Sequence, residues 1–163
     1  MQFDLFNHVN LWNSRTGYKM ANRSVGYRGK KFDEVCFQYQ LRKSLDDNRP
    51  RSNIKNAVMH EIPFKMAQNF ILKYEWLGTM GTTKFSLGMF CDDDLVGVMC
   101  FGLTAGTGAL SELFGDDNKH LGIVLVRGAC ASHAHPHSGS WMIGQAKKYL
   151  IKKGYNFVIA YSD

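Results

Sequence analysis

One loop and the helix expected after it carry the residues with the clearest chemical potential. Residues 132–140 read Ser-His-Ala-His-Pro-His-Ser-Gly-Ser and directly precede an amphipathic stretch. The first turn of a helix presents unpaired backbone N–H groups and the positive end of the helix dipole. Gly139 lets an anionic group approach closely, so this helix start could bind phosphate. Ser138 or Ser140 could instead cap the helix, and the two roles are compatible.

The side chains around this loop leave several alternatives open. Histidine occupies every second position at His133, His135 and His137. An extended segment would place the three imidazoles on one face, where they could bind zinc or iron. Pro136 weakens that geometry, and we expect phosphate contact or loop packing and no metal. Arg127 lies in an apolar run, where a guanidinium needs either a carboxylate partner or a substrate anion.

The composition indicates one folded domain. The chain has 163 residues, of which 45% are hydrophobic and 21% are charged, enough for one core. No stretch reaches the roughly 18 apolar residues of a membrane helix, and no leader is recognisable. Cys91 and Cys100 lie in strand-like runs, so we expect buried free thiols. These features predict an intracellular, cytoplasmic protein that does not bind membranes.

The positive charge is concentrated in the first third of the chain. Residues 1–55 hold 11 Lys/Arg and 5 Asp/Glu, whereas the remaining residues hold 9 of each kind. In this part of the chain, the cationic residues Arg23, Arg28, Lys30 and Lys31 are interspersed with aromatic side chains. This mixture suits a nucleic acid whose bases can stack, so we predict DNA binding. A solvated basic surface without a partner is the alternative.

The hydrophobic pattern predicts the elements that position these residues. A short helix is expected within 33–45, a linker at 46–53, and a domain boundary between a basic extension (1–54) and a domain at 55–163. The expected elements are strand 55–62, a helix from Pro63 to Gly78, strands 84–90, 95–101 and 121–130, a helix at 140–153 and strand 155–161. Residues 102–119 are expected to be a loop. The order β-α-β-β-β-α-β predicts a fold of the α/β class. Its sheet is expected to be mixed, with parallel and antiparallel strands as in α+β proteins, and the helices are expected to pack on it.

This order resembles the GNAT acyltransferase superfamily, whose acyl-CoA N-acyltransferase fold we therefore expect. Within that superfamily, five segments are similar to phage Mom-type DNA-modification proteins. They are residues 75–81, 95–102, 126–130, 134–140 and 159–163. The resemblance covers residues 55–163 and implies that the last strands of the fold are missing. The unpaired sheet edge could then be completed by a second copy, giving a homo-oligomer.

The resemblance also implies a function, namely addition of a small acyl-type group to the N6 amine of adenine in DNA. Ser140 matches the serine that opens the family's helix, and Asp163 matches the acid that ends the next strand, so both are expected to be catalytic. Acetyl-CoA or a related acyl donor would lie over the helix start. The residues expected to hold it are Arg127, Ala129, His137, Ser138, Gly139 and Ser140.

The expected chemistry needs oxyanion donors and a proton acceptor. Backbone N–H groups along 126–131 could be the donors, and Asp163 could accept the proton directly or through water. Duplex DNA hides N6, so the base would have to be flipped or single-stranded. Two alternatives remain: an acetyl-CoA-dependent N-acetyltransferase acting on another amine, and a non-catalytic nucleic-acid-binding module.

Overall fold

The computed structural model describes residues 11–12, 19–20, 37–45, 48–103 and 108–160. The chain divides into two compact units, one of residues 1–40 with 162–163 and one of residues 41–161. In the first unit, β1 (Leu11–Trp12) pairs with β2 (Lys19–Met20) in antiparallel fashion. The predicted boundary after residue 54 remains a prediction.

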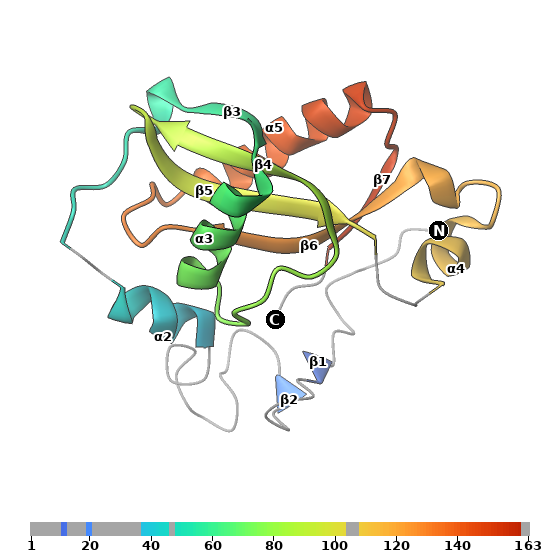
Figure 1. Ribbon diagram of the computed structural model, residues 1–163, viewed down its shortest axis with the longest axis horizontal. Helices are drawn as coiled ribbons and strands as arrows, with labels where there is room; N and C mark the ends of the chain where they lie inside the picture. Colours follow the sequence, from blue (N-terminus) through green and yellow to red (C-terminus); the bar gives the residue numbers. More distant parts are fainter. Residues whose placement is uncertain (1–10, 13–18, 21–36, 46–47, 104–107, 161–163) are drawn as a thin grey trace. The chain divides into compact units, whose positions relative to one another are not determined.

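The second unit is a mixed α+β fold built on a five-stranded open sheet (Figure 1). Its strands are β3 (Val58–Ile62), β4 (Thr83–Cys91), β5 (Asp94–Gly102), β6 (Gly122–Cys130) and β7 (Phe157–Ala160). Their order in the sheet is β3-β4-β5-β6-β7, with three antiparallel pairs followed by one parallel pair. The predicted mixed sheet is therefore confirmed.

Four α-helices accompany these strands within the described residues. They are α2 (Phe37–Ser44), α3 (Phe64–Tyr74), α4 (Ala109–Phe114) and α5 (Ser138–Lys152). The helix α3 begins after Pro63, whose missing N–H costs nothing there, and α5 is followed by Gly154 at φ +86°. Both of these helix boundary signals were predicted from the sequence.

The hairpin between β4 and β5 has a turn whose two central residues are not glycine. Asp92 and Asp93 adopt φ values of 48° and 67°, and Cys91 pairs with Asp94 across the turn. Two successive positive φ values are typical of a type I′ turn, which matches the right-handed twist of the strands. The turn therefore sets the register of the two central strands.

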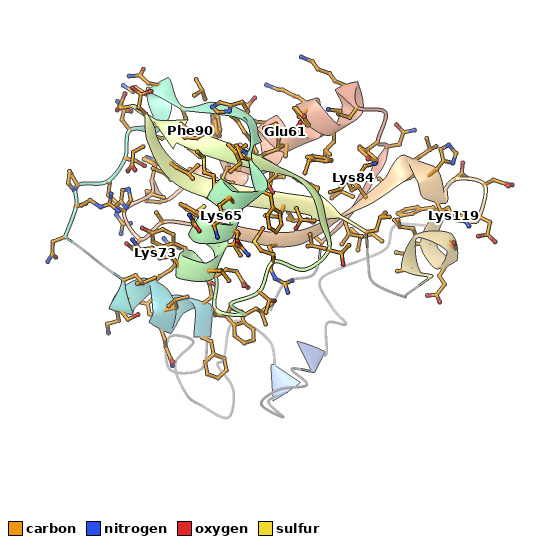
Figure 2. The ribbon with its side chains drawn as sticks, in the orientation of Figure 1. Glu61, Lys65, Lys73, Lys84, Phe90 and Lys119 are labelled. Carbon is orange, nitrogen blue, oxygen red and sulfur yellow. The ribbon has the colours of Figure 1, made fainter. Side chains whose placement is uncertain are left out.

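The sheet is covered by α3 on one face and α5 on the other (Figure 1). On the α3 side, Phe70 and Ile71 pack with Val98 and Cys100 of β5. On the α5 side, Met142 packs against residues of β4, β5 and β6. Tyr149 of α5 also donates a hydrogen bond to Glu61 of β3, which Figure 2 labels. Each face of the sheet therefore has its own apolar layer.

Several elements differ from the prediction, and α3, for example, ends at Tyr74 rather than at Gly78. The expected loop at 102–119 contains α4, in which Leu110 lies over Gly122 and the Phe114 ring stacks on Phe157 at 4.1 Å. Six residues are too short to show a helical period, so tertiary packing decides this helix. The helix α5 begins at Ser138 rather than at Ser140, which places Ser140 inside its first turn.

Candidate anion and acyl-donor site at the start of α5

Within the described residues, β6 and β7 pair over only the first half of β6. Gly122–Leu125 lies beside Phe157–Ala160, and no described residue pairs with Val126–Cys130 on that side. At the same point the register between β5 and β6 shifts, because Cys100 faces Arg127 whereas Phe101 faces Leu125. The residue left over, Val126, forms a β-bulge, a feature common beside active sites.

Beyond the bulge, β6 has backbone N–H groups that find no acceptor among the described residues. Ala131 donates its N–H to Val96 of β5, and hydrogen-bonding direction alternates along an antiparallel strand. The N–H of Ala129 therefore points toward β5, whereas those of Gly128 and Cys130 point away from it. Gly128 is exposed, with only one atom within 4 Å of a side-chain position there. A bound group can therefore approach this strand edge closely.

The first turn of α5 supplies a second set of free donors. The first helical bond runs from Trp141 N to His137 O at 3.0 Å, and Ser138 N bonds to His135 O at 2.9 Å. Within the described residues, the N–H groups of Gly139 and Ser140 have no acceptor. Both residues are exposed, and nothing lies within 4 Å of a side-chain position at Gly139. These amides and the helix dipole form a potential site for an anion.

The serines of this turn do not cap the helix, contrary to one of the predicted alternatives. The structural N-cap is His137, which makes no side-chain cap bond. Ser140 Oγ instead donates to His137 O at 3.0 Å, so its exposed hydroxyl oxygen keeps an acceptor face. Ser138 is only 1% exposed, and its Oγ has no hydrogen-bond partner among the described residues. A buried hydroxyl without a partner is costly, so this one is a candidate partner for a bound group.

Arg127 lies on the α3 face and holds the segment that follows α3. Its Nε and Nη2 donate to Thr79 O at 2.7 Å and to Thr79 Oγ1 at 2.8 Å, and its Nη1 donates to Val126 O. Its Nε lies 3.9 Å from Oε2 of Glu75, whose side chain is 8% exposed. A carboxylate partner, one of the two predicted alternatives, is therefore present.

The three histidines of the loop do not converge on one point. His133 is 4% exposed, and its Nε2 lies 2.7 Å from Oδ2 of Asp94. His135 Nδ1 accepts a hydrogen bond from the N–H of His137 at 3.1 Å. Within the described part of the chain, no three His, Cys, Asp or Glu side chains form a group that could hold a metal ion.

The thiols of the described cysteines are free, and Cys91 and Cys100 are buried as predicted. Cys130, at the free edge of β6, is only partly buried. Burial raises the pKa of its thiol, and the positive charge of Arg42 on α2 opposes that rise. Arg42 therefore lies close enough to the end of β6 to contribute positive potential there.

Several predicted functional residues lie outside the described residues. They are Asp163, Arg23, Arg28, Lys30 and Lys31, so their catalytic and DNA-binding roles remain predictions. The sequence indicated the backbone N–H groups of residues 126–131 as a set, and the structure adds that, among the described residues, those of Gly128 and Cys130 point away from β5. The contact between Asp94 and His133 joins residues 39 apart, for which the sequence carries no signal.

Two further findings concern the chain as a whole. No helix among the described residues is both long and apolar enough to cross a lipid bilayer. No curated protein matches the chain. A model of the Mom protein family, however, matches residues 56–163, which include β3 to β7, the start of α5 and Asp163. The match covers about two thirds of the sequence, and the chain therefore belongs to the Mom protein family.

Proposed function

We propose that this protein is a DNA-modifying transferase that adds a small acyl-type group to the N6 amine of adenine. The observation that carries the proposal is the family match over residues 56–163. The matched region includes the paired strands, the free edge of β6 and the first turn of α5. This fits a phage-type DNA-modification protein with one donor site and one DNA surface.

The proposed reaction joins the adenine N6 nitrogen to the acyl carbon of the donor. The N6 lone pair is delocalised into the ring, so the attack needs a stabilised oxyanion and a proton acceptor. The free N–H groups of Gly128 and Cys130 are suitable oxyanion donors. Asp163, the predicted acid, would accept the proton that N6 loses when the bond to the leaving group breaks.

The donor is proposed to be acetyl-CoA or a related acyl donor whose anionic part binds the first turn of α5. The amides of Gly139 and Ser140 would bind the anionic oxygens, and the Ser138 hydroxyl would gain a partner at the buried end of this turn. Within the described residues, no acidic side chain belongs to the first turn of α5, so an anion meets no like charge on it. Arg42 adds positive potential at the end of β6.

The acceptor is proposed to be DNA held by the basic first third of the chain. Arg23, Arg28, Lys30 and Lys31 would contact phosphates, which orient the strand without reading its sequence. Because N6 is paired in a duplex, the adenine must be flipped out or lie in a single strand. The reaction should therefore be faster on single-stranded or mismatched DNA than on a matched duplex.

The decisive experiment is mass spectrometry of nucleosides from DNA of cells that express the full chain. We expect a modified adenosine that carries the mass of a small acyl-type group. Ser140→Ala should abolish it if this hydroxyl acts in catalysis. Ser44→Ala is the matched control, because Ser44 Oγ makes the same bond to the carbonyl three residues earlier, at 2.7 Å. Unmodified adenine in the wild-type sample would refute the proposal.

A further inference from the structure

Residues 48–52, here called the strap, contact the 131–137 loop that joins β6 to α5. Ser52 makes two of these contacts: its N–H donates to His133 O at 2.9 Å, and its Oγ accepts from the N–H of His135 at 3.0 Å. One residue of the strap therefore bonds to two residues of the loop, through its backbone N–H and its side-chain oxygen. The loop is therefore fixed from outside the sheet.

Arg51 makes a second connection through its side chain. Its Nη1 donates to two carbonyl oxygens of the loop, those of Ser132 and, at 3.2 Å, Ala134. A charged donor strengthens such bonds relative to a neutral one. Because both partners are backbone carbonyls, this guanidinium helps to fix the backbone conformation of the loop.

A third connection passes through Asp94, at the start of β5. Its Oδ2 lies 2.7 Å from His133 Nε2 and 3.5 Å from Arg49 Nη1. The same carboxylate therefore joins the strap, the loop and the β4–β5 hairpin. His133 is buried, so this contact fixes the middle of the loop from inside.

The loop connects the two sets of free N–H groups. It begins after Cys130, at the free edge of β6, and ends at Ser138, where α5 starts. Its course sets the distance between the amides at Gly128 and Cys130 and those at Gly139 and Ser140. A ligand that contacts both sets binds best when that distance is already correct, because binding then costs less ordering.

We propose that Arg51 is a positioning residue that holds the 131–137 loop and thereby sets the affinity of the α5 amides for an anion. The inference rests on the proposed donor site at the start of α5. It adds that residues before the family-matched region are needed to preorganise that site. Without Arg51, the carbonyls of Ser132 and Ala134 are left to water and the loop samples other positions.

The test is a titration of the full chain with inorganic pyrophosphate, followed by the backbone amide signals of Gly139 and Ser140 in nitrogen–proton NMR spectra. The wild-type signals should shift in a saturable manner. Arg51→Ala should bind about tenfold more weakly, as expected for loss of preorganisation. Arg51→Lys should recover part of the affinity, since an ammonium can donate to the same carbonyls. Lys55→Ala is the control, because it removes one nearby cation without removing a donor to these two carbonyls.

Amide hydrogen exchange supplies a second measurement on the same samples. Arg51→Ala should speed exchange at Ala134 and Ser138, whose N–H groups form the two turns of the loop. Should Arg51→Ala prove unfolded, Ser52→Ala takes its place, since it removes the bond to His135 and keeps the backbone bond from Ser52 to His133. An unchanged pyrophosphate affinity in the folded variant would overturn the positioning role alone. A wild-type protein without shifts at Gly139 and Ser140 would overturn both this role and the proposed donor site.

Discussion

At the scale of single residues, Arg127 connects three parts of the fold. It joins β6 to Thr79 through two hydrogen bonds and lies beside the nearly buried carboxylate of Glu75. Its guanidinium adds positive charge beside the Glu75 carboxylate, which also accepts a hydrogen bond from the N–H of Leu77 at 3.0 Å. Arg127 is thus a structural residue as well as a predicted contact for the donor.

Arg127→Met should lower the free energy of unfolding by about 1–2 kcal/mol, because Thr79 loses two hydrogen bonds and the nearly buried Glu75 carboxylate loses a nearby positive charge. Urea denaturation followed by circular dichroism measures the change. Lys119→Met is the control, since its ion pair with Asp116 is exposed to solvent and should have no measurable effect. Equal losses in the two variants would contradict the structural role of Arg127.

The 132–140 segment shows how much of the candidate site could be predicted from residue types alone. The sequence predicted a functional role for this segment, and the structure places an exposed helix start there. It did not reveal that Ser138 is buried while Ser140 is exposed, because that depends on where α5 begins. Residues two positions apart on a helix lie about 200° apart around its axis, so Ser138 and Ser140 point to opposite sides of α5.

At the scale of secondary-structure elements, glycines show where strands and helices meet other parts of the chain. A side chain at Gly102, the last residue of β5, would lie 1.8 Å from the carbonyl oxygen of Thr82. That oxygen belongs to the backbone and cannot move away easily. A side chain at Gly144, in the middle of α5, would meet nothing within 4 Å.

Gly102→Ala should therefore destabilise the protein by at least about 2 kcal/mol through overpacking against the backbone. Gly144→Ala should stabilise it by about 0.5–1 kcal/mol, because alanine favours the helix and the site is open. Thermal unfolding of the two variants checks both signs. A stable Gly102→Ala variant would mean that β4 and β5 are not so close at this end.

The sequence predicted most elements because their patterns are regular and their ends are marked. The apolar runs of β4 and β5 on either side of an acidic turn, Pro63 before α3 and Gly154 after α5 are all local signals. The helix α4 was not predicted because six residues carry no period, and it is stabilised by Gly122 and Phe157. Local signals thus predict elements that are stable through their own pattern, and not those that depend on a distant partner.

At the scale of the whole molecule, the distribution of charge makes a prediction about DNA. Replacing Arg28, Lys30 and Lys31 by alanine should weaken DNA binding and flatten its salt dependence, by about 0.9 in the log–log slope for each phosphate that is no longer neutralised. Fluorescence anisotropy at several salt concentrations measures the slope. Lys65, Lys73 and Lys84, labelled in Figure 2, provide a control that removes the same charge from α3 and β4. If the salt dependence of DNA binding has the same slope in the two triple variants, the basic segment contributes only general surface charge.

The amino-acid sequence by itself predicted the mixed sheet and the helices α2, α3 and α5, since these depend on periodicity and turn residues close together in the chain. It also indicated the segment expected to bind the donor. It also carried the resemblance to Mom-type proteins that the family match over residues 56–163 bears out. Only the tertiary structure decided which N–H groups are free and what holds them in place. The bulge at Val126, the short pairing of β7 and the bonds from Arg51 to the 131–137 loop all join residues distant in sequence. No local pattern encodes such contacts, because they form only when the packed sheet brings those residues together.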